Sequence, residues 1–249
     1  MKKAFKFKIL SYFHTLLSFV NTLFISLCLF SLTANAAVNT TSATITPIQI
    51  TMVDQDNNPL ANAVIEYALS QPANKDSSIN QEADSSNDTT YIMDQINKQF
   101  EPHVLIVPQN SLVSFPNSDD IRHHVYSFSP TKTFELKLYS GRPKQPLLFD
   151  QHGIVTIGCN IHDSMVGYIY VSNTTAAKTD LEGKALIFAD TGKNIEIKIW
   201  HPDQSKGLNH HKKVTLTSAM MVNKEALFVL NITKPKPRNS FEELNFNDL

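Results

Sequence analysis

The sequence has few cysteines, no surplus of positive charge and, beyond its N-terminal segment, no pattern typical of a long helix. Its 249 residues include two Cys, and 22 Lys and Arg stand against 23 Asp and Glu. Binding to nucleic acid therefore has no electrostatic support. The sequence also lacks a Ser/His/Asp arrangement, a phosphate-binding loop and a nucleophile elbow, so none of these catalytic motifs is available to it.

The first 36 residues have the three parts of a secretory signal peptide. A basic start (1–8) precedes an apolar stretch (9–32), and the small residues Ala34 and Ala36 follow. We expect cleavage before Ala37, a periplasmic mature protein and no membrane span after cleavage. The alternative is an uncleaved anchor, because the apolar stretch is long enough to cross a bilayer. Without the segment's four lysines, 18 basic and 23 acidic residues give the remaining 213 a net charge of −5.

Short runs rich in Val, Ile, Phe, Tyr and Thr recur between turn residues, which predicts an all-β fold. The stretch 71–90 is almost entirely Ser, Asn, Asp, Gln, Thr and Ala, so we expect a mobile loop or linker there. Residues 234–249 are expected to form a polar tail. The expected strands are 45–53, 63–69, 103–108, 112–117, 124–128, 153–158, 165–172, 184–188, 195–201, 213–217 and 226–232.

The mature chain keeps a single cysteine, Cys159, and this residue shares a short loop with two other metal-binding side chains. Cys159, His162 and Met165 follow the pattern Cys-x2-His-x2-Met directly after an apolar strand. A thiolate and imidazoles in a trigonal plane, with a weak axial thioether, suit copper that cycles between two oxidation states. The competing explanations for a lone thiol are an inert buried side chain or a disulfide to another chain. We expect the combined donors to bind copper.

A second imidazole is required, and the best candidates are His123 and His124, at the exit of a polar turn between two strands. Neighbouring side chains at the start of a strand face opposite sides, so only one of the two can point inward. Asp119 and Asp120 precede Arg122, where we expect turn formation and a solvated ion pair. The residues alone leave the choice between the two histidines open.

These motifs resemble those of the cupredoxins, the blue copper proteins. The likeness rests on Phe-x-Asn-x-Asp and His-x-Val (115–125), on the strand before the loop (149–159) and on the loop itself, which is most similar to that of amicyanin. The resemblance maps the first ligand onto His123 and leaves His124 where the family usually has an Asn that ties the two ligand loops together. It implies one type 1 copper held by His123, Cys159, His162 and Met165, with His124 as the alternative first ligand.

The chain as a whole resembles a group of exported bacterial proteins labelled methylamine utilization proteins. The shared runs are His-His-Val-Tyr-Ser-Phe-Ser (123–129) and Gly-Cys-Asn-Ile-His-Asp (158–163). That label does not itself show a role in methylamine oxidation.

Two further segments resemble the transthyretin-like fold of carboxypeptidase regulatory domains. Residues 53–65 look like its opening strand, turn and second strand, and residues 178–200 look like its continuation. We therefore expect a cupredoxin-like Greek-key β-sandwich at 91–172, inserted into a second small β-sandwich made from 44–70 and 176–233. The alternative assigns 44–70 to the cupredoxin's own first strands, because 82 residues are few for that fold.

The sequence thus favours a periplasmic type 1 copper protein that transfers single electrons between redox partners, such as a dehydrogenase or a cytochrome c. All expected ligands come from the protein, which leaves no open position for a substrate, so we expect the chain not to be an enzyme. The alternatives are a copper carrier or sensor with an exchangeable metal, and a β-sandwich interaction module without redox activity.

Overall fold

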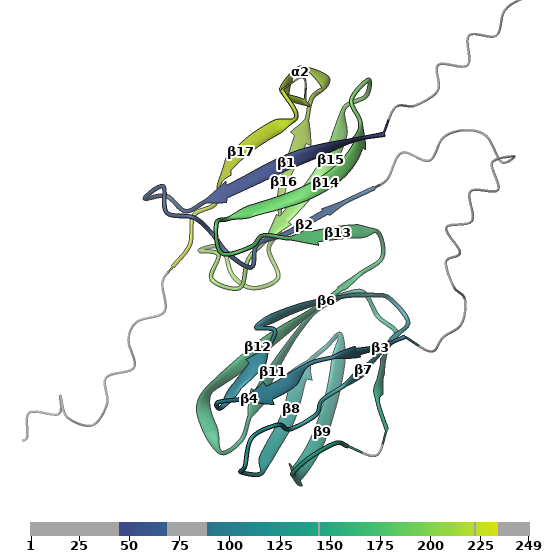
Figure 1. Ribbon diagram of the computed structural model, residues 1–249, viewed down its shortest axis with the longest axis vertical. Coiled ribbons are helices and arrows are strands. Elements are labelled where there is room, and N and C mark those ends of the chain that lie inside the picture. Colours follow the sequence, from purple (N-terminus) through teal and green to yellow (C-terminus); the bar gives the residue numbers. More distant parts are fainter. Residues whose placement is uncertain (1–44, 69–88, 144, 222, 234–249) are drawn as a thin grey trace, which may run out of the picture. The chain divides into compact units, whose positions relative to one another are not determined.

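The computed structural model describes residues 45–68, 89–143, 145–221 and 223–233. The expected signal peptide, nearly all of the 71–90 linker and the 234–249 tail lie outside these ranges. Within them, no helix is long and apolar enough to span a bilayer. The prediction of an all-β fold is confirmed, since the described part consists of strands with one short helix, α2 (Ser218–Met221) (Figure 1).

The strands nearest the two ends of the described chain form two sheets. One sheet has the strand order β14-β1-β17 and the other β13-β2-β15-β16. Their strands are β1 (Ile45–Val53), β2 (Val64–Tyr67), β13 (Thr175–Lys178), β14 (Lys184–Asp190), β15 (Ile195–Trp200), β16 (Lys212–Leu216) and β17 (Glu225–Val229).

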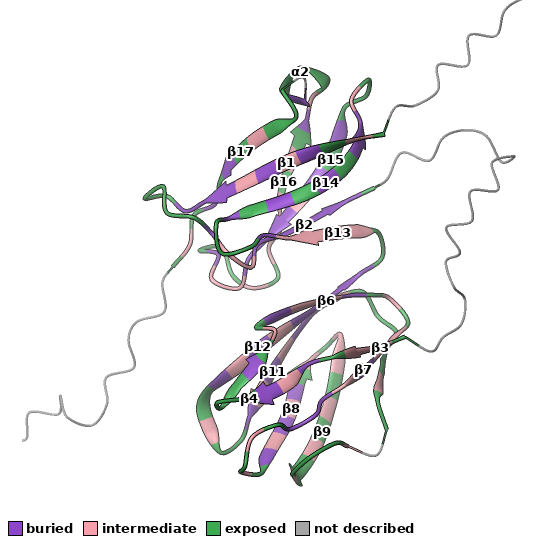
Figure 2. Ribbon diagram, viewed as in Figure 1, coloured by how far each residue is buried: buried purple, intermediate pink, exposed green. Residues whose placement is uncertain are grey.

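Side chains from both of these sheets form one apolar core. Ile48 and Ile50 on β1 and Ile197 and Ile199 on β15 are fully buried in it. Each such side chain stabilises the fold by about 1.5–3 kcal/mol relative to an exposed position. Buried and exposed residues alternate along β14, as Figure 2 shows, because successive side chains of a strand face opposite sides. The transthyretin-like identity of this part stays a prediction.

The strands between β2 and β13 in the sequence form a separate set of sheets. Their orders are β10-β7-β3, β6-β12-β11-β8-β9 and the hairpin β4-β5. They are β3 (Thr90–Ile92), β4 (Asp94–Ile96), β5 (Gln99–Glu101), β6 (Val104–Pro108), β7 (Ser111–Ser114), β8 (His123–Ser129), β9 (Lys132–Tyr139), β10 (Leu147–Phe149), β11 (Gly153–Cys159) and β12 (His162–Ser172).

These sheets enclose a second apolar core that contains two of the expected copper ligands. Val113 and Phe149 reach it from the three-stranded sheet, and Val155 reaches it from the five-stranded sheet. Cys159 and Met165 belong to the same buried cluster. The sulfur donors therefore lie in a packed interior, where neighbouring side chains restrict their movement.

The chain returns to the first pair of sheets directly after β12. Strand β13 pairs antiparallel with β2, so that Ala177 lies opposite Ile65. Strands β1 and β2 make all their described ladders with strands that follow residue 174. The strands between residues 90 and 172 consequently form one continuous segment of the sequence. It lies in the chain between β2 and β13, which are neighbours in one sheet.

Gly183 lies in the turn before β14, where both the backbone conformation and the lack of room for a Cβ favour glycine. Its φ is +73°, and a Cβ there would lie 2.4 Å from the carbonyl oxygen of Met52. We expect Gly183→Ala to lower the free energy of unfolding by about 2–4 kcal/mol, because it adds backbone strain to a steric contact. Urea unfolding followed by the fluorescence of Trp200, the single Trp, measures this loss.

Gly207→Ala is the matched control, since Gly207 also has a positive φ, of +93°, but a Cβ there meets nothing within 4 Å. This variant should lose only about 1–2 kcal/mol, from the backbone conformation alone. Equal losses in the two variants would show that the contact with Met52 contributes nothing.

Candidate metal centre

Strand β8 presents its residues alternately to the core and to the opposite face. His123 and Val125 are buried, and His123 has no exposed surface. His124 lies on the other face, where its Nε2 is 2.8 Å from Oε1 of Glu135 on β9. The two-residue period of the strand therefore turns His123, and not His124, toward the core.

Cys159 and His162 face each other across the tip of the β11–β12 hairpin. They pair across the ladder just after an irregularity between Gly158 and Cys159, with Asn160 and Ile161 between them. The N–H of Asn160 donates a hydrogen bond of 3.0 Å to the carbonyl oxygen of His124. The backbone of His124 thus ties the loop to β8, at the position where the cupredoxins usually have an Asn.

The donor atoms of His123, Cys159 and His162 lie within 4.8 Å of one another. Sγ of Cys159 is 3.6 Å from Nδ1 of His123 and 3.6 Å from Nδ1 of His162. For metal–sulfur bonds of about 2.3 Å and metal–nitrogen bonds of about 2.0 Å, tetrahedral or trigonal angles separate the two ligand atoms by about 3.5–3.7 Å. The spacing therefore fits two nitrogens and one sulfur around a single ion.

The surroundings of these residues are apolar on one side and open on the other. Cys159 is 3% exposed and Met165 is 1% exposed, and both belong to the same apolar cluster. His162 is partly exposed, and the neighbouring Ile161 is 49% exposed. The residues present are consistent with a type 1 copper site whose His162 side reaches the surface. Metal binding by Met165 and by the other three residues stays a prediction.

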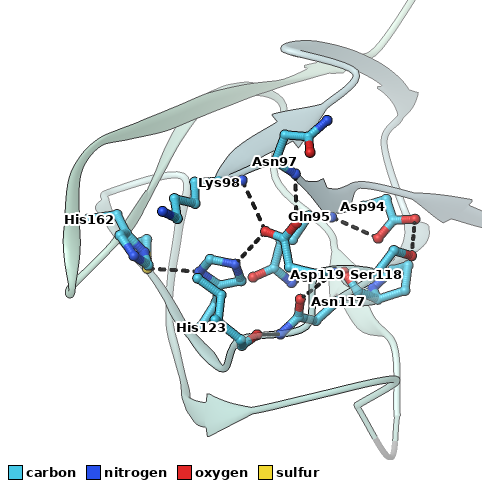
Figure 3. A network of polar contacts seen from close by, with 12 residues as sticks. Asp94, Gln95, Asn97, Lys98, Asn117, Ser118, Asp119, His123 and His162 are labelled. Carbon is cyan, nitrogen blue, oxygen red and sulfur yellow. Dashed lines mark hydrogen bonds and ion pairs between the residues drawn. The ribbon is translucent and has the colours of Figure 1, made fainter.

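Asp119 holds the side of the His123 ring that faces away from Cys159. Nε2 of His123 is 2.7 Å from Oδ2 of Asp119. The backbone N–H groups of Asn97 and Lys98, in the turn between β4 and β5, donate to the same carboxylate at 2.6 and 3.0 Å (Figure 3). Burial by itself would raise the pKa of Asp119, but these N–H donors and His123 outweigh it and hold the pKa below its ordinary value.

The expectation of a solvated ion pair is wrong for Asp119, because its carboxylate binds His123 and two backbone N–H groups. The loop that carries Asp119 is fixed by Asn117. Its amide Nδ2 donates to the carbonyl oxygens of Ile121 and Tyr139, and its Oδ1 accepts from the N–H of Asp119. The sequence motif Phe-x-Asn-x-Asp contains Asn117 and Asp119 but assigned neither a role, and the Asn97–Lys98 turn was not identified as part of the site.

No protein-family model matches the chain, and no curated protein matches it. Solved structures resemble about a third of it. A copper-containing nitrite reductase from Thermus scotoductus SA-01 is 21% identical with a TM-score of 0.33, over 35% of this chain and only 23% of its own. A purple cupredoxin from Nitrosopumilus maritimus is 22% identical with a TM-score of 0.30, over 34% of this chain and 100% of its own.

A mutant of amicyanin in its reduced Cu(I) form is 23% identical with a TM-score of 0.30, over 34% of this chain and 84% of its own. At these TM-scores and identities the similarities carry no weight for function. The functional assignment depends instead on the distances among His123, Cys159 and His162.

The two adjacent histidines offer a direct test of the geometry. We expect His123→Asn to weaken Zn(II) binding more than about 100-fold, because a ligand is lost and not merely one of its supporting partners. His124→Asn should change the affinity by no more than about twofold, as for a surface substitution. Isothermal titration calorimetry with Zn(II) measures both, and a larger loss in the His124 variant would contradict the assignment.

Proposed function

We propose that this chain holds one copper ion in a type 1 site and transfers single electrons between redox partners in the periplasm. The observation that carries the proposal is the convergence of Nδ1 of His123, Sγ of Cys159 and Nδ1 of His162 within 4.8 Å. A thiolate with two imidazoles suits copper and differs from the all-oxygen sets that Mg²⁺ and Ca²⁺ prefer. Bound copper would supply a reversible change of one electron.

The way the protein holds these donors favours electron transfer over catalysis. His123 is fixed between Cys159 and Asp119, and Cys159 and His162 are fixed by the ladder of one hairpin. Donors held in these ways keep similar positions in both oxidation states, which reduces the reorganisation that accompanies electron transfer. With Met165 as a further donor, the protein itself would supply every ligand, so substrate turnover is not expected.

His162 is the proposed point of electron entry and exit. It is the partly exposed member of the three-residue group, and the exposed side chain of Ile161 lies beside it in the chain. A small apolar surface next to a ligand suits a brief contact with a periplasmic redox protein, for example a dehydrogenase or a cytochrome c. The periplasmic location follows from the expected signal peptide.

The test is the visible absorption spectrum of the mature protein, from Ala37 onward, titrated with Cu(II). We expect an intense thiolate-to-copper band that saturates at one equivalent, bleaches with ascorbate and returns on reoxidation. Cys159→Ser should abolish the band, because the thiolate is the source of the transition.

Met165→Leu is the matched control, since it changes a buried side chain in the same cluster at nearly constant volume. This variant should keep a band of altered position or intensity. A band that persists in Cys159→Ser would refute the ligand assignment. Colourless binding by the wild-type protein would favour a copper carrier or sensor, and absence of binding would favour an interaction module without metal.

A further inference from the structure

We propose that Asp119 is a positioning residue that orients His123 and lowers the reduction potential of the metal centre. The inference rests on the proposed copper function and deepens it. It concerns a side chain that is not a ligand, the Asp of the Phe-x-Asn-x-Asp motif, to which the sequence assigned no role at the metal centre.

The His123 ring is held at both of its nitrogens. Nδ1 lies 3.6 Å from Sγ of Cys159, and Nε2 lies 2.7 Å from Oδ2 of Asp119. A neutral imidazole that offers Nδ1 to a metal carries its proton on Nε2, so Nε2–H donates to the carboxylate. Such carboxylate–histidine contacts fix the tautomer and the ring orientation and increase the basicity of the ligand nitrogen.

The carboxylate is itself immobilised in a largely buried place. The side chain of Asp119 is 11% exposed and that of His123 is 0% exposed. Oδ1 accepts the N–H of Asn97, and Oδ2 accepts the N–H of Lys98. Asn97 and Lys98 have φ of +55° and +59°, the left-handed conformation that points both N–H groups at one acceptor. A fixed charge in this partly dehydrated site acts more strongly on its neighbours than the same charge in water.

The direction of the effect follows from the change of charge on reduction. One electron from a donor converts Cu(II) to Cu(I), the donor loses that electron, and the positive charge at the site falls by one. A nearby negative carboxylate and a more basic imidazole both stabilise the more positive Cu(II) state. Asp119 therefore opposes reduction.

The decisive measurement is the midpoint potential of the copper-loaded protein, determined against a one-electron mediator couple. Asp119→Asn keeps the size of the side chain and a hydrogen-bond acceptor but removes the charge. In this variant we expect the preference of the metal centre for Cu(II) over Cu(I) to fall at least about tenfold. A tenfold fall corresponds to a rise of about 59 mV in the midpoint potential for one electron.

Asp120→Asn is the matched control, since Asp120 is the next residue, carries the same charge and is exposed. Because solvent screens an exposed carboxylate, this change should alter the preference by no more than about twofold. An unchanged or lower potential in Asp119→Asn, or an equal rise in both variants, would overturn the proposal. A wild-type protein without the thiolate-to-copper band would instead refute the proposed function.

A second measurement on the wild-type protein covers the case in which Asp119→Asn does not fold. Nitrogen-15 NMR of the histidine side chains in the reduced Cu(I) protein reports the protonation of each ring nitrogen. The proposal requires a proton on Nε2 of His123 that exchanges slowly with water, because the ring is fully buried and the proton is donated to the Asp119 carboxylate. An Nε2 that lacks this proton, or whose proton exchanges as fast as that of an exposed histidine, contradicts it.

Discussion

Strand β8 runs antiparallel to β11, and the register between them determines where the His123 imidazole lies. Val125 pairs with Cys159 and Tyr126 with Gly158. A shift of one residue would turn His124 into the core and His123 away from the sulfur, because successive side chains alternate between faces. The orientation of His123, its contact with Asp119 and its approach to Cys159 all depend on this one pairing.

The sequence was sufficient to predict the fold class and the proximity of Cys159 and His162, for a local reason. Cys159 and His162 are three residues apart and join two adjacent strands, so the hairpin alone brings them together. To choose between His123 and His124, one must know where β8 begins and which of its faces meets the core. The sequence predicted the start of this strand one residue late, at 124. The role of Asp119 could not be predicted, since its N–H donors come from residues 21 and 22 positions earlier.

The strands that were not predicted show the limits of periodicity. Strands β3, β4, β5, β10 and β13 contain only three or four residues each, too few to establish an alternating pattern. Strand β9 is longer and does alternate, but it lies at the edge of its sheet with residues that are half-buried or exposed. Its apolar residues Phe134, Leu136 and Leu138 were the signal that could have identified it.

The first strand of the described chain depends on the last one. In β1, Thr51 pairs with Lys184 of β14 on one side and with Leu227 of β17 on the other. Pairing β1 with strands so far away in the sequence restricts the chain between them, which costs conformational entropy. Such non-local pairings also form slowly. The ladders of β3 to β12 join residues between 90 and 172 only. During synthesis from the N-terminus, the strands around Cys159 can therefore assemble before the sheet of β1 is complete.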